Sequence, residues 1–96
     1  MDQKEFNNLK SPHDLKNQID ELFDELISQQ NRKVLATARQ LISHLTADDI
    51  LNPHDFPELM QNPIFNYEEG IAAGLMAAQF AMRARIPHIV RNQNEK

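Results

Sequence analysis

The stretch that decides the fold is NYEEGIAAGLMAAQFAMRARI, residues 66–86. Most of these residues are good helix formers, and apolar side chains occur on nearly every side of the helix they predict. Asn66 is a suitable N-cap, and Glu69 occupies the capping-box position three residues later. Pro87 is expected to end the helix, because a proline disfavours the α region for the residue before it. Since a helix apolar nearly all round is normally buried, we expect the rest of the chain to pack around this one.

One face of this central helix carries only glycine and alanine. Each glycine costs roughly 1 kcal/mol relative to alanine inside a helix, and close approach of a second backbone is the expected compensation. That backbone would belong either to the same chain or to a partner. At about 100° per residue, Ala72, Gln79 and Arg83 are left as a narrow water-facing strip. The predicted interaction face consists of Gly70, Gly74, Ala77, Ala81 and Ala84.

Upstream, the spacing of apolar residues predicts two helices joined by a short polar turn. Ser11 and Pro12 form a good helix start. Residues 28–31 predict the joint, and the second helix is expected to end near Leu45. So short a joint predicts an antiparallel hairpin. The core stripe expected on the first helix is Leu15, Ile19, Leu22, Phe23, Leu26 and Ile27.

Residues 46–65 contain three prolines and many apolar side chains. Pro53, Pro57 and Pro63 fix their φ angles and stiffen this connection. It is too apolar for a flexible linker, so an ordered strap with short helices is expected. The predicted fold is therefore all-α: a small helical bundle of four to five helices, with an antiparallel hairpin, a proline-rich strap and a long apolar C-terminal helix.

Length and composition fit one domain. The 96 residues are 41% hydrophobic and include only two glycines, both in the central helix, which argues against a sheet. Residues 1–10 are expected to form a loose N-terminal arm, residues 11–86 a single helical domain and residues 87–96 a polar C-terminal tail. The chain has no cysteine, which excludes disulfides and thiolate chemistry.

Neither a secretory signal nor a membrane span is predicted. The first ten residues, MDQKEFNNLK, lack the apolar segment of a signal peptide. The uncharged run from Gly70 to Met82 is shorter than the roughly 20 apolar residues of a transmembrane helix. A cytoplasmic protein without membrane contact is therefore expected.

No set of residues predicts a catalytic, metal or cofactor site. None of the four histidines lies three or four residues from another, so no helical two-histidine metal site is expected. The paired acids Asp48/Asp49 and Glu68/Glu69 lie at expected helix starts, where the helix dipole accounts for them. Arg39 and His44 have a spacing similar to that of the arginine and histidine pair in small helical ribonucleases of the HEPN type. This unspecific spacing leaves a small histidine-dependent hydrolase or nuclease as the second alternative.

The sequence favours a non-enzymatic protein–protein interaction module, either a homodimer or a small adaptor. The reason is apolar surplus, since the central helix exposes more apolar circumference than the predicted hairpin and strap can cover. The first alternative is a nucleic-acid-binding regulator whose C-terminal arginines, Arg83, Arg85 and Arg91, contact phosphates. It is less favoured because this segment lacks interleaved aromatic residues and the net charge of the chain is −4.

Overall fold

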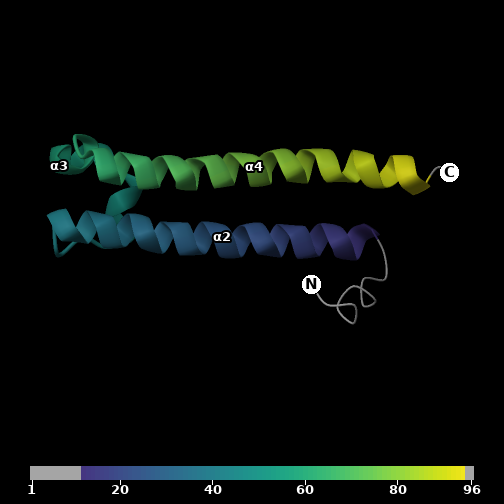
Figure 1. Cartoon of the computed structure of the whole chain (residues 1–96), viewed down its shortest axis with the longest axis horizontal. Helices are drawn as coiled ribbons and strands as arrows, with labels where there is room; N and C mark the ends of the chain where they lie inside the picture. The colour runs from purple at the N-terminus through teal and green to yellow at the C-terminus, as the bar shows by residue number, and fades with distance from the viewer. Residues whose placement is uncertain (1–11, 95–96) are drawn as a thin grey trace.

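The computed structural model describes residues 12–94 of the 96-residue chain, and side chains from residue 14 to residue 88. Two long α-helices, α2 and α4, run antiparallel and lie side by side (Figure 1). The described part contains no strand, so the all-α class is confirmed. In chain order the elements are α2 (Pro12–Leu41), the 3-10 helices η1 (Asp49–Leu51) and η2 (Pro53–Asp55), α3 (Pro57–Met60) and α4 (Pro63–Asn94).

A single helix, α2, occupies the region in which two helices were expected. Residues 28–31 contain no glycine or proline that would interrupt the helical hydrogen bonds. The buried positions also continue through them, because Gln30 is followed by Val34 and Ala38 at intervals of four. The expected joint at 28–31 is therefore wrong, and the hairpin is formed by α2 and α4 instead. With α2 continuous, the described chain has three α-helices rather than four or five.

The start of α4 also differs from the expectation. The helix begins at Pro63, and its cap is Asn62, whose Oδ1 accepts a hydrogen bond from the Phe65 amide at 2.9 Å. Asn66, the expected cap, lies inside the helix and donates its side-chain amide to the Met60 carbonyl at 2.9 Å. The capping function belongs to the asparagine that precedes the proline, a combination typical of helix starts.

Pro87 does not end α4, which continues to Asn94. A proline inside a helix removes one backbone hydrogen bond, here the bond to the Arg83 carbonyl, and its ring crowds the preceding turn. The preference against the α region before a proline is a bias, and helical turns on both sides override it here. Residues 87–94 therefore extend the helix, whereas the expected arm, residues 1–10, lies outside the described residues.

The connection between α2 and α4 closes one end of the hairpin (Figure 1). Thr46 and Asp49 stabilise its beginning reciprocally. The Thr46 amide donates to Asp49 Oδ2 at 2.9 Å, and the Asp49 amide donates to Thr46 Oγ1 at 3.3 Å. The largest fully buried side chains, Leu45, Leu59 and Phe65, lie in or beside this connection. The core is therefore densest at the closed end.

Along the hairpin, α2 and α4 meet at a heptad seam. The buried positions of α4 are Phe65, Ala72, Gln79 and Ile86, each seven residues from the next, which is the spacing of coiled-coil packing. The expected water-facing strip on α4 is therefore wrong for two of its three residues, because Ala72 and Gln79 are only 3% and 7% exposed, whereas Arg83 is exposed. Alanine lets the two backbones approach, and α2 provides hydrogen-bond acceptors for the glutamine.

The hairpin is elongated. Its extents are 55 × 27 × 20 Å and its radius of gyration is 18.0 Å, against about 12.5 Å for a compact domain of this length. Two helices can bury only the facing stripe of each, so large apolar side chains on their flanks stay exposed. None of the described helices is long and apolar enough to span a membrane.

Candidate interaction surface

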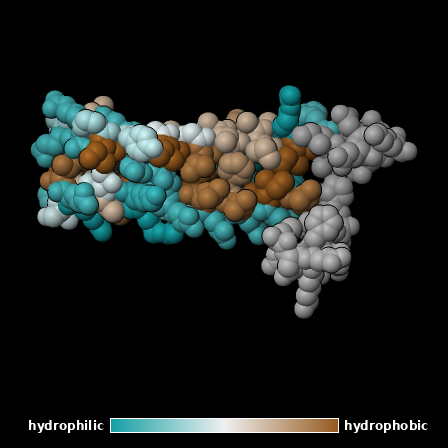
Figure 2. All heavy atoms as spheres, in the orientation of Figure 1, coloured by the Kyte–Doolittle hydropathy of each residue, from teal (hydrophilic) through white to brown (hydrophobic). Residues whose placement is uncertain are grey.

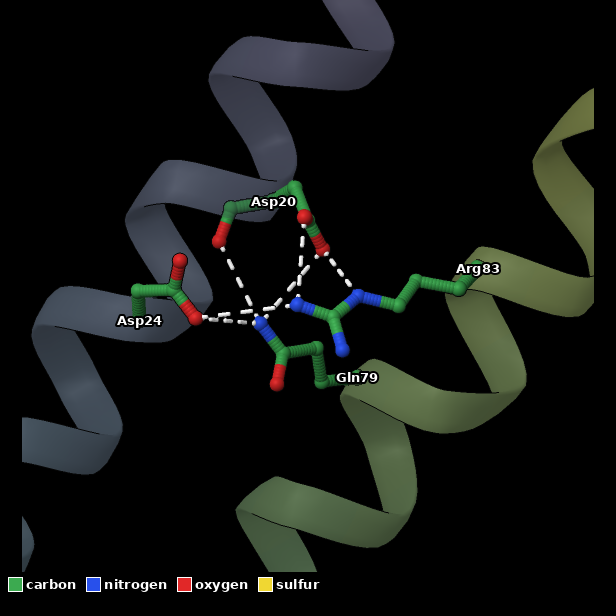
Figure 3. Close-up of polar contacts among 4 residues, drawn as sticks. All are labelled: Asp20, Asp24, Gln79 and Arg83. Carbon is green, nitrogen blue, oxygen red and sulfur yellow. Dashed lines mark hydrogen bonds and ion pairs between the residues drawn. The ribbon is translucent and has the colours of Figure 1, made fainter.

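A polar cluster links α2 and α4 towards the open end of the hairpin (Figure 3). Gln79 donates its side-chain amide to Asp24 Oδ1 at 2.8 Å and makes longer contacts of 3.4 Å with the Asp20 carbonyl and carboxylate. Arg83 donates from Nε to Asp20 Oδ1 at 2.7 Å and from Nη2 to Asp20 Oδ2 at 3.2 Å. This two-pronged contact fixes the relative position of the helices along their axes.

The cluster also shifts the acidity of its members. The hydrogen bond from the Arg83 side chain holds the pKa of Asp20 below its ordinary value, and the same bond raises the pKa of Arg83. Both side chains remain partly exposed, at 49% for Arg83 and 28% for Asp20. The pair joins α2 to α4 and uses two of the three guanidinium nitrogens of Arg83.

A second polar contact lies nearer the closed end. Gln30 is buried and donates its amide to Glu68 Oε2 at 2.6 Å and to the Glu68 carbonyl at 2.9 Å. Buried amides at seam positions are satisfied in one register only, so they select the alignment of two helices. Gln30 and Gln79 thus fix the alignment of α2 against α4 at two separated points.

On one side of the seam, the flanks of both helices carry exposed apolar residues. Leu22 of α2 is 53% exposed and Leu15 is 46% exposed. Ile71, Ala78 and Met82 follow one flank of α4 at helical spacing. Because α4 runs antiparallel to α2, this flank lies on the same side of the hairpin as the leucines. Figure 2 shows a hydrophobic band along the two helices. We name this surface the leucine face, and it consists of Leu15, Leu22 and Leu26 of α2 with Ile71, Ala78 and Met82 of α4.

The leucine face is almost free of charge. Between Leu15 and Gln29 on this side of α2, and between Tyr67 and Met82 on this side of α4, helical spacing places no charged residue. Lys33 and the end of α4 carry the nearest charges. An apolar surface with depleted charge is typical of the centre of a protein–protein interface.

Apolar spacing does not predict this face, because it predicts that Leu15, Leu22 and Leu26 of the first helix lie in the core. Their neighbours Phe23 and Ile27 do turn toward the seam and are half-buried. The signal in the sequence for this face is the heptad from Phe65 to Ile86. If that heptad is the contact stripe of α4, the leucines on the flank of α2 have no partner within the chain.

The predicted glycine–alanine face lies on the side of α4 that turns away from α2. All five of its residues are exposed. A Cβ added at Gly70 or Gly74 would meet no atom within 4 Å. The expected close approach therefore does not occur within the chain, and an approach by a partner stays a prediction. Gly74 borders the leucine face by helical spacing, whereas Ala77 and Ala84 turn toward the opposite flank.

The opposite side of the hairpin holds a groove beside the strap, with a volume of about 520 Å³. Leu35 and Ile50 contribute apolar surface from α2 and η1, and Met76 contributes it from α4. Asp48 and Glu69 stand among its polar residues. No histidine, serine or threonine lines it.

The residues of the two alternative functions are not brought together into a site. Arg83 is paired with Asp20, Arg85 is exposed, and the side chain of Arg91 lies outside the described residues. Arg39 donates from Nε to the Leu45 carbonyl at 2.7 Å, an internal bond next to its expected partner histidine. In the described part of the chain, no three histidine or acidic residues are grouped to hold a metal ion.

These surfaces are the available guide to function. No model of a protein family, no curated protein and no solved structure matches the chain.

Proposed function

We propose that the chain is a non-enzymatic protein–protein interaction module that binds through its leucine face, either to a second copy of itself or as a small adaptor. The observation that carries the proposal is the exposure of three leucines on one flank of α2, beside an uncharged flank of α4. These side chains are about half exposed, so covering each of them would add roughly half of the about 1.5–3 kcal/mol that full burial of a leucine contributes.

The size of the face supports an interface rather than scattered exposure. Ile64 and Tyr67 extend it toward the closed end, and both are about two-thirds exposed. From Ile64 to Arg85 it is about 32 Å long at 1.5 Å per residue. Two helices about 8–10 Å apart make it about 20 Å wide. Roughly 600 Å² per partner, or about 1,200 Å² in total, lies at the lower end of the range of specific interfaces.

Self-association is the form that can be tested directly. The double variant Leu22→Gln, Leu26→Gln should weaken association at least about tenfold, because two apolar contacts are lost. Sedimentation equilibrium over a range of concentrations measures this, and circular dichroism checks that helix content is unchanged. The matched control is Leu51→Gln, which changes an exposed leucine on η1 beside the groove and should associate as the parent does.

A parent chain with a monomer mass at all concentrations would remove self-association and leave the adaptor form. That form predicts that crosslinking in the native cell captures a partner whose recovery is lost in the double variant and retained in the control. Equal recovery with both variants would show that the leucine face is not the binding surface.

The nucleic-acid alternative has less support. The Arg83–Asp20 pair occupies two of the three guanidinium nitrogens of one of its three arginines, which leaves that arginine fewer donors for a phosphate. The flank of α2 next to Arg83 is acidic, with Glu21 and Asp24 exposed, and would repel a phosphate backbone.

A further inference from the structure

We infer that the leucine face binds a second copy of the chain, placed so that α2 of each copy packs against α4 of the other. Both hairpins point in the same direction about a two-fold axis parallel to the helices, and the four helices form a bundle. This rests on the proposed function and adds to it the identity and the orientation of the partner.

Contacts inside the hairpin establish which residues of α2 and α4 lie at the same height. Gln79 reaches Asp24 at 2.8 Å, and Gln30 reaches Glu68 at 2.6 Å. Residues at equal height therefore have numbers that add to about 100. A two-fold axis parallel to the helices leaves heights unchanged, so the same relation holds between α2 of one copy and α4 of the other.

This relation sets large side chains against small ones. Leu22 of one copy lies level with Ala78 of the other, and Leu26 lies level with Gly74, which has open space beside it. Two leucines set against an alanine and a glycine, on each of the two sides of the bundle, let the two layers approach closely there. A two-fold axis perpendicular to the helices would instead stack α2 on α2, so that leucines face leucines and no leucine is set against Ala78 or Gly74.

Charge agrees with this alignment. By the same relation Arg85 of the other copy is level with Leu15, at the end of α2 away from Lys33, so the two cations nearest the face are kept apart. At the opposite end Lys33 is level with Tyr67, a pair suited to a cation–π contact. If α2 ran parallel to α4 of the other copy, Lys33 and Arg85 would lie at the same end and repel each other.

The absence of cysteine allows a clean test with single spin labels. Gln18→Cys and Ala36→Cys change two exposed residues on the same side of α2, five turns apart and away from the seam. Diagonal helices of a four-helix bundle are about 13 Å apart. Pulsed electron spin resonance on each labelled dimer should therefore give a distance of about 15–25 Å, the same at both positions.

The perpendicular axis makes a different prediction. Because positions 18 and 36 are about 27 Å apart along α2, at least one of the two label pairs would then be separated by about 27 Å or more along the axis. A dimer with such a distance overturns the orientation and leaves the proposed function intact. A monomer mass with no dipolar coupling overturns both the inference and the self-associating form of the function.

A second variant checks the contact itself. Gly74→Leu should weaken the dimer at least tenfold and leave the hairpin folded, because the added side chain meets nothing in its own chain but meets Leu26 of the other copy. The control is Ala77→Leu, one turn away on the flank that turns from the leucine face, and it should dimerise as the parent does. Equal dimerisation of both variants would overturn the arrangement.

Discussion

Arg83 and Asp20 are 63 positions apart in the chain, yet Arg83 Nε lies 2.7 Å from Asp20 Oδ1. The contact joins the C-terminal half of α4 to the N-terminal half of α2, far from the closed end where the largest core side chains lie. This contact and the neighbouring side-chain amide of Gln79 therefore keep α2 and α4 in contact at the open end of the hairpin.

The first prediction concerns pH. The pKa of Asp20 is lowered in the folded chain by the Arg83 hydrogen bond, so the stabilisation is complete above the ordinary aspartate pKa, about 3.9, and is lost as pH falls through the lower folded value. The stability advantage of the parent over Arg83→Gln should be constant above about pH 5 and shrink below about pH 4. Urea titrations at several pH values measure it. Arg85→Gln, the control, should show no such advantage, and an advantage that persists at pH 2 would contradict the assignment.

The second prediction concerns the closed end. Phe65 is fully buried between the connection and the start of α4, so Phe65→Ala should lower the free energy of unfolding by about 3–5 kcal/mol. That is a large part of the total for a domain of this size, about 5–10 kcal/mol. Phe65→Leu, which keeps most of the volume, should lose much less. A shift of the urea midpoint by the same amount in Leu51→Ala, whose side chain is exposed and lies outside the leucine face, would show that the core does not lie here.

The third prediction concerns Gly70, where an added Cβ meets nothing within 4 Å. Gly70→Ala should raise the free energy of unfolding by about 0.5–1 kcal/mol, because alanine has the higher helix propensity. The reverse change at the exposed Ala77, Ala77→Gly, should lower it by a similar amount. Both are best measured in the Leu22→Gln, Leu26→Gln background, in which association does not contribute. Destabilisation by Gly70→Ala would indicate a close neighbour that the hairpin lacks.

The fourth prediction concerns Gln79, which is buried and bonded to α2. Gln79→Ala should cost about 1 kcal/mol of stability through the lost hydrogen bond. Thermal unfolding of this variant and of Gln79→Glu separates the effects, since a carboxylate beside Asp20 and Asp24 should be worse than alanine. Equal stability of glutamate and alanine at pH 7 would speak against the cluster.

The fifth prediction concerns the interior proline of α4. Pro87→Ala restores a backbone amide that can donate to the Arg83 carbonyl and removes the crowding of the ring. Hydrogen exchange should slow at the backbone amides of residues 88–90, and helix content should rise. Unchanged exchange there would mean that the helix is already interrupted at this point.

The sequence predicted the helical class because apolar spacing, few glycines and helix-forming residues all agreed, and it predicted where the connection lies because three prolines mark it. It did not predict that α2 is continuous. Residues 28–31 are polar and resemble a turn in composition, but they contain no glycine or proline. They keep helical geometry in the hairpin, where Gln30 donates a hydrogen bond to Glu68 of the neighbouring helix.

The prediction of which side of α4 is buried is wrong for a related reason. The most apolar arc was assigned to the interior, yet the seam uses Ala72 and Gln79, since the facing helix supplies carboxylates and needs room for its backbone. Which stripe of an amphipathic helix is buried depends on the partner helix, and a single sequence does not identify that partner. The leucine face could be recognised only after the seam was known.

Because α2 begins and α4 ends at the open end of the hairpin, opposite the connection (Figure 1), Pro12 and Asn94 lie at one pole. In a bundle of two hairpins with the same orientation, Pro12 and Asn94 of both copies would lie at that pole together. Segments that continue from Pro12 or Asn94 would thus start beside their duplicates, while the opposite pole, formed by η1, η2 and α3, would be left open to other molecules.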